Sequence, residues 1–166
     1  MPDALNTKPV QSPREPPAAK RLSDLALRFT LGKLNANECD HTTLIALIAW
    51  LLLKSDEAIA TQRIISGLRG LDRSGCPPLA PGRGYNETVA GFWITIVRRY
   101  LTTRVHHADP ARAVRSVVEA FAGKPELIFD YFSRRRLHSW EARAHWIEPD
   151  IKPLPDAPAP TDRTDP

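Results

Sequence analysis

Apolar side chains recur with a helical period along most of this chain, and most clearly after residue 86. Their positions there follow the spacing i, i+3, i+4, i+7, i+8, i+11 and i+12, which is the pattern of one face of an α-helix. The spacing predicts an amphipathic helix with an inward face made of Val89, Phe92, Trp93, Ile96, Val97, Tyr100 and Leu101.

The segment from Leu44 to Leu53 is apolar on every side when it is drawn as a helix. Asp40 is a favourable N-cap for it, so we expect a helix from His41 to about Lys54. A helix without a polar face belongs at the centre of a globular fold. Its ten apolar residues are half of the roughly twenty that a membrane crossing needs, so we expect no membrane span.

Glycines, prolines and capping residues divide the rest of the chain into further helices, and no segment alternates as a strand does. The pattern predicts an all-α fold, a single compact domain of six or seven helices with Trp50, Phe92 and Trp93 in its core. Besides the two helices above, the expected segments are about 24–33, 55–71, 110–122, 125–132 and 139–146.

The two ends of the chain differ from the middle in composition. Residues 1–21 and 149–166 hold eleven of the sixteen prolines and almost no large apolar side chains. Such segments bury too little surface to offset the entropy that ordering costs. We therefore expect disordered Pro-rich tails at 1–21 and 149–166 around a helical domain at 22–148.

Charge and cysteine content narrow the class of protein. Lys and Arg total 23 and Asp and Glu 19, which gives a mildly basic net charge of +4. The two cysteines, Cys39 and Cys76, are too few for a disulfide framework, and no Cys/His cluster has zinc-site spacing. We expect a cytoplasmic protein in a reducing environment, with no metal and no cofactor.

Four polar residues stand at the starts of the two most apolar helices. His41 lies in the first turn of one; at the other, Asn86 falls on the inward stripe, Glu87 on its flank and Tyr85 just before it. If the two helix starts face each other, these residues line one ligand pocket between helices. His41 and Glu87 are then the candidate acid/base residues, and Tyr85 and Asn86 would orient the ligand.

Each of these residues also has a purely structural interpretation. His41 can form a hydrogen bond within the core, and Asn86 can serve only as an N-cap. Glu87 can be an exposed acid that favours a helix N-terminus. A buried and paired Glu87 favours function, because an isolated buried charge would be costly, whereas an exposed one favours the structural interpretation.

Two longer motifs carry a resemblance to a known family. The segments GYNETVAGFW and YFSRRRLHSWEARAHWIEPDIKPL, with His41 before TTLIALIAW, resemble a family of small uncharacterised bacterial all-helical proteins over residues 29–154. That family has a His-x-x-His-Leu helix and a Gly-Tyr-His-Glu-Thr helix start, and here Leu44 and Asn86 replace two of the histidines. It has no established activity. Its three histidines and one glutamate fit a divalent-metal site, of which this chain keeps His41 and Glu87.

The densest group of cations is the basic patch formed by Arg134, Arg135, Arg136 and Arg143. Such a surface can bind phosphates or an acidic protein. No recognition helix, RNA-binding motif or zinc finger accompanies it, which argues against nucleic acid. A solvated face, or internal pairing with Glu148 and Asp150, is the alternative.

Three functional hypotheses follow. The leading one is a small intracellular helical protein whose interhelical pocket binds a small molecule, or which acts as an accessory to a neighbouring enzyme. One alternative is an interaction or regulatory module whose arginine-rich face binds an acidic protein or nucleic acid. The other is a metal-dependent enzyme with a reduced ligand set. Whether the protein is an enzyme stays open, and a small molecule or a protein, but no membrane, is the expected partner.

Overall fold

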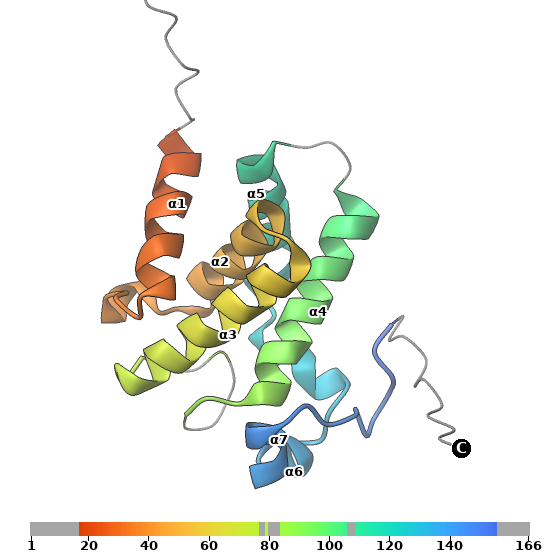
Figure 1. The fold of residues 1–166 in the computed structure, drawn as a ribbon. Helices are drawn as coiled ribbons and strands as arrows, with labels where there is room; N and C mark the ends of the chain where they lie inside the picture. The colour runs from red at the N-terminus through yellow and green to blue at the C-terminus, as the bar shows by residue number, and fades with distance from the viewer. Residues whose placement is uncertain (1–16, 77–78, 80–83, 106–108, 156–166) are drawn as a thin grey trace, which may run out of the picture.

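The computed structural model describes residues 17–76, 79, 84–105 and 109–155. These residues form seven α-helices and two short 3-10 helices, with no strand among them, which confirms the predicted all-α fold (Figure 1). The elements are α1 (Pro17–Thr30), η1 (Ala36–Glu38), α2 (His41–Lys54), α3 (Glu57–Arg73), α4 (Glu87–Arg104), α5 (Pro110–Phe121), η2 (Pro125–Asp130), α6 (Arg134–Leu137) and α7 (Trp140–Ala144).

Capping side chains begin several of the helices where the sequence predicts them. Asp40 accepts a hydrogen bond from the Thr43 backbone N–H at 2.7 Å, and Asn86 accepts one from that of Val89 at 3.1 Å. Asp109 and Ser139 cap α5 and α7 in the same way. Each bond satisfies an N–H that the helix itself leaves without a partner.

Helix α2 lies at the centre of the fold. It packs against α1, α3, α4 and α5, and Figure 1 shows α3 crossing it between α1 and α4. The predicted core residues are buried, with Trp93 and Phe92 fully enclosed and Trp50 3% exposed. The short helices α6 and α7 lie at the end of the molecule where α4 begins, and α7 packs on α4. No helix of the described residues is long and apolar enough to cross a bilayer.

The described fold is wider than the predicted domain of residues 22–148. Helix α1 starts at Pro17, and Leu154 belongs to the core with 5% of its surface exposed. Asp150 accepts hydrogen bonds from the Ser133 backbone N–H at 2.8 Å and hydroxyl at 2.6 Å. Prolines prevent a helix here but leave an extended chain that can still bury a leucine. The rest of the predicted tails, 1–16 and 156–166, lies outside the described residues.

Glycines allow α1 to approach α3 closely. Gly67 of α3 faces the fully buried ring of Phe29, and a Cβ at this position would overlap that ring. One turn further, a Cβ on Gly70 would lie 3.2 Å from the Cα of Gly32, which itself has a left-handed φ of 65°. The contact therefore depends on the absence of side chains at these positions.

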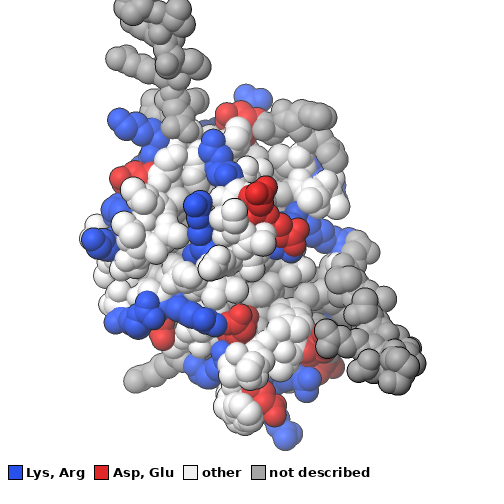
Figure 2. Space-filling model, viewed as in Figure 1, with Lys and Arg blue, Asp and Glu red and all other residues white. Residues whose placement is uncertain are grey.

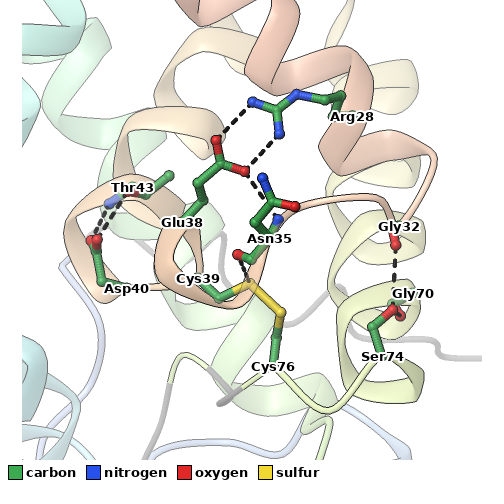
Figure 3. The surroundings of a disulfide bond; sticks show 10 residues. All are labelled: Arg28, Gly32, Asn35, Glu38, Cys39, Asp40, Thr43, Gly70, Ser74 and Cys76. Atoms are coloured by element: carbon green, nitrogen blue, oxygen red, sulfur yellow. Dashed lines mark hydrogen bonds and ion pairs between the residues drawn. A yellow bond between two sulfur atoms is a disulfide. The ribbon is translucent and has the colours of Figure 1, made fainter.

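A disulfide joins the start of α2 to the end of α3, which corrects the expectation of reduced cysteines (Figure 3). Cys39 and Cys76 have Cα atoms 5.9 Å apart and are 2% and 8% exposed. Two cysteines cannot make a network of bridges, but a single pair needs only that the fold bring them together. Beside it, Arg28 donates to both carboxylate oxygens of Glu38, at 2.6 and 2.8 Å. That guanidinium is the main reason that the pKa of Glu38 falls to about 2.

Removing the disulfide should destabilise the fold. A bridge over 37 residues restricts the unfolded chain by an amount worth roughly 4 kcal/mol. We expect the Cys39→Ala/Cys76→Ala variant to unfold at lower urea concentration than the wild type, and a reductant to shift only the wild type. Two results together would contradict this prediction. They are alkylation of two thiols in the unreduced wild type, and equal urea midpoints for the wild type and the double variant.

The close approach of α1 to α3 predicts that Gly67→Ala is destabilising. Overlap with the enclosed Phe29 ring should cost roughly 1–3 kcal/mol, more than the gain of up to about 1 kcal/mol in helix propensity. Gly123→Ala is the matched control, because a Cβ there meets nothing within 4 Å. Urea unfolding should show a lower midpoint for the first variant only, and equal midpoints would count against the described packing.

Candidate functional site

Glu87 is the centre of a polar cluster between α3 and α4. One of its carboxylate oxygens, Oε2, accepts hydrogen bonds from the Tyr85 hydroxyl at 2.7 Å and from Arg69 at 2.8 Å. The Arg69 guanidinium also lies 5.1 Å from the centre of the Tyr85 ring. The side chain of Glu87 is 22% exposed, so it is the partly buried and paired carboxylate that favours a functional interpretation.

Arg69 is a member of this cluster that the sequence analysis missed. It lies on α3, 18 residues before Glu87, and no local spacing connects the two. Within α3, Arg69 has the position of an ordinary exposed residue. Only the packing of α3 against α4 makes it the counter-ion of Glu87.

The cluster keeps its tyrosine protonated. Burial and the hydrogen bond to Glu87 raise the pKa of Tyr85 well above its usual range. The hydrogen bond to Glu87 also raises the pKa of Arg69. Tyr85 is therefore a hydrogen-bond donor here and not a base. The second carboxylate oxygen of Glu87, Oε1, has no hydrogen-bond partner among the residues that the structure describes, which leaves it able to accept one from a ligand.

Both ends of the Asn86 amide are engaged in holding the fold together. Its oxygen caps α4, and its nitrogen donates to the Leu137 carbonyl of α6 at 2.9 Å. Asn86 and Tyr85 also line a small cavity with mostly apolar walls. The cavity measures about 20 Å³, which is room for about one water molecule and not for a metabolite.

A larger space lies on the other side of Glu87, in what we call the α3–α4 groove. This groove is open to solvent and measures about 690 Å³. A second ion pair, between Glu57 and Arg98 at 2.8 Å, lies beside it, and Arg98 also donates to the Thr61 hydroxyl at 3.2 Å. The lining residues are Glu57, Ala58, Thr61, Gln62, Ile65, Ser66, Arg69 and Glu87.

His41 does not belong to this cluster. Its Nε2 lies 3.2 Å from the Phe121 carbonyl oxygen, and its ring stands edge-on to Trp93 at 4.9 Å. Trp93 is six residues after Glu87, roughly 9 Å further along α4. The structure thus brings Tyr85, Asn86 and Glu87 together and places His41 against a different part of the core.

His41 is a neutral, half-buried histidine in this structure. A carbonyl oxygen can only accept, so Nε2 carries the proton and the buried Nδ1 is left without a hydrogen-bond partner. Burial lowers the pKa of His41, and the Phe121 carbonyl and the Asp40 carboxylate only partly offset it. This arrangement fits the structural interpretation of His41 better than an acid/base role.

Internal contacts occupy much of the predicted basic patch. Arg134 pairs with Glu126 at 2.8 Å and lies over the ring of Phe129, and Arg136 donates to the Glu148 carbonyl at 3.1 Å. Arg143 is also engaged in an interaction, and Arg135 is exposed. On the face seen in Figure 2, cationic and anionic side chains are interspersed, so no large field of one sign forms there.

The described residues contain no group of three or more His, Cys, Asp or Glu that could hold a metal ion. Comparison with models of known protein families, with curated proteins and with solved structures finds no match to this chain. The resemblance to an uncharacterised bacterial family therefore stays a prediction.

The environment of His41 predicts a specific loss of stability in acid. Its folded pKa lies below the usual value of about 6.5, so the unfolded chain binds the proton more readily. The stability that neutral His41 contributes is fully present above about pH 6.5. It is lost as the pH falls from there through the folded pKa. Urea unfolding at neutral and mildly acid pH should show a smaller acid-dependent loss for His41→Gln. The exposed His138→Gln is the control and should behave as the wild type; identical pH dependence in all three proteins would exclude this role.

Proposed function

We propose that the protein binds a small polar molecule in the α3–α4 groove, acting alone or as an accessory to an enzyme, with Glu87 as the recognition group. The observation that carries the proposal is the two-partner anchoring of Glu87 beside an open space. Arg69 and Tyr85 hold the carboxylate by one oxygen, so its position is fixed before a ligand arrives. Fixing a binding group in advance reduces the entropy that binding costs.

The groove favours a ligand rich in hydrogen-bond donors. Oε1 of Glu87 accepts, and the groove adds the hydroxyls of Thr61 and Ser66 and the amide of Gln62. The two carboxylates are each matched by an arginine, so the lining carries little net charge. Amines and polyols are the chemical classes that fit such a lining.

The geometry supports binding better than catalysis. General acid/base work needs a titratable group within hydrogen-bond reach of the substrate and, for a relay, of a second such group. The candidate base His41 has no contact with the cluster, Tyr85 is held protonated, and Arg69 stays charged. The arginine-rich docking surface has weaker support, because Arg134 and Arg136 already have internal partners.

A cytoplasmic location stays a prediction of the sequence. The Cys39–Cys76 disulfide weighs against it, because structural disulfides are rare in the cytosol and common in oxidising compartments. The proposed binding does not depend on the compartment, since the groove and the disulfide share no residue.

Titration with putrescine and with myo-inositol, followed by protein NMR shifts, tests the proposal. We expect at least one to bind saturably, with shifts at Thr61, Gln62 and Ser66. Glu87→Gln should weaken that binding about tenfold, as the loss of a charge-assisted hydrogen bond predicts. Tyr85→Phe should weaken it less, because the phenyl ring keeps the packing.

Glu119→Gln is the matched control for charge, because Glu119 is exposed on α5 and does not line the groove. It should bind both probes as the wild type does. Absence of binding by either probe, or equal binding by the Glu87 and Glu119 variants, would reject the proposed function.

A further inference from the structure

The α3–α4 groove follows one side of α3 along most of its length. Its lining residues on that helix recur at i, i+1, i+4, i+5, i+8, i+9 and i+12, from Glu57 to Arg69. At 1.5 Å per residue, this stretch of α3 spans about 18 Å. The shape of the groove therefore favours an elongated ligand over a compact one.

A carboxylate stands at each end of the groove. Glu57 is the first residue of α3 and pairs with Arg98 of α4 at 2.8 Å, and Glu87 is the first residue of α4 and pairs with Arg69 of α3 at 2.8 Å. The two ion pairs cross between the helices in opposite order, so α3 and α4 run in opposite directions. Along α4, Glu87 and Arg98 are about 17 Å apart, which matches the span along α3.

Each carboxylate is held through one oxygen and keeps the other for a ligand. Glu57 uses Oε1 for Arg98, and Glu87 uses Oε2 for Arg69 and Tyr85. Oε2 of Glu57 and Oε1 of Glu87 have no hydrogen-bond partner within the described parts of the chain. A protonated amine, which has N–H donors and no acceptor, matches each of these oxygens.

The middle of the groove suits a chain that joins two such amines. Ala58 and Ile65 offer apolar contact to methylene groups, and Thr61, Gln62 and Ser66 offer oxygens to any amine within the chain. Both acids are already matched by arginines, so the overall charge of the groove attracts a cation only weakly. The spacing of the two free oxygens is therefore the main source of selectivity.

We propose that the ligand of this groove is a linear polyamine, with one terminal ammonium at Glu87 and the other at Glu57. This inference rests on the proposed function and specifies its ligand. An extended chain covers roughly 3.5 Å for every three bonds, so about nine to eleven bonds between the terminal nitrogens cover roughly 10–13 Å. Hydrogen bonds of about 3 Å at the two ends supply the rest of the span.

The two carboxylates should contribute unequally. The side chain of Glu87 is 22% exposed and has two partners, whereas that of Glu57 is 70% exposed and has one. An exposed ion pair is weaker than a partly buried one. A short diamine should therefore bind at Glu87 alone, and only a longer one should also gain the contact at Glu57. The second contact is then intramolecular, which raises the overall affinity.

Titration of the full chain with putrescine and with 1,8-diaminooctane, followed by protein NMR shifts, tests the inference. Both probes carry two ammonium groups and differ only in length. The longer diamine should bind at least about tenfold more tightly and should also shift the backbone amides of Glu57 and Ala58. Octylamine has the same chain with one ammonium, and should bind at least about tenfold more weakly than the longer diamine.

Glu57→Gln should weaken 1,8-diaminooctane binding about tenfold and change putrescine binding by less than about twofold. Glu87→Gln should weaken the binding of both diamines. Glu119→Gln removes the same charge from an exposed position of α5 outside the groove, and should leave both affinities unchanged. Because Glu57 is exposed, its variant should keep the fold.

The outcomes separate this inference from the proposed function. Putrescine binding that depends on Glu87, with no gain from the longer chain or no effect of Glu57→Gln on it, would overturn the polyamine inference alone. Binding of myo-inositol without binding of either diamine would do the same. Absence of binding by all of these probes would reject the proposed function, and the inference with it.

Discussion

The burial of most of the apolar middle of α2 is the constraint on which this structure depends. A helix with no polar face must be covered on every side, and α1, α3, α4 and α5 supply that cover. Each large apolar side chain removed from water contributes about 1.5–3 kcal/mol, and Leu44, Ile45, Leu47 and Ile48 are all at most 2% exposed. The surrounding helices therefore have little freedom in position, and the sites between them are held by the same packing.

Each side of helix α4 meets a different neighbour within this arrangement. Its inward face carries Phe92, Trp93 and Val97 into the core. Its first residue, Glu87, meets α3 at the groove.

The hydrogen-bond partners of a polar residue within the protein determine whether it can still bind a ligand. Both ends of the Asn86 amide form hydrogen bonds within the fold. His41 is neutral and lies against the Phe121 carbonyl and the Trp93 ring. Glu87 keeps one carboxylate oxygen without a protein partner among the described residues while the other is anchored. Among these three residues, Glu87 is therefore distinguished by the unused hydrogen-bonding capacity of a fixed group and not by burial alone.

The sequence by itself determined what depends on neighbours within about one helical turn. The helical period placed α2 and α4, and Asp40 could be read as a cap because it bonds an N–H only three residues away. Tertiary structure alone decided the contacts between distant residues: Arg69 with Glu87, Cys39 with Cys76, and His41 with Phe121, which are 18, 37 and 80 residues apart. For the same reason, His41 lies apart from the other predicted site residues, against Phe121 and Trp93. The position of a residue on a helical face indicates which way its side chain points. The neighbour that this side chain meets is determined by the packing of the whole chain.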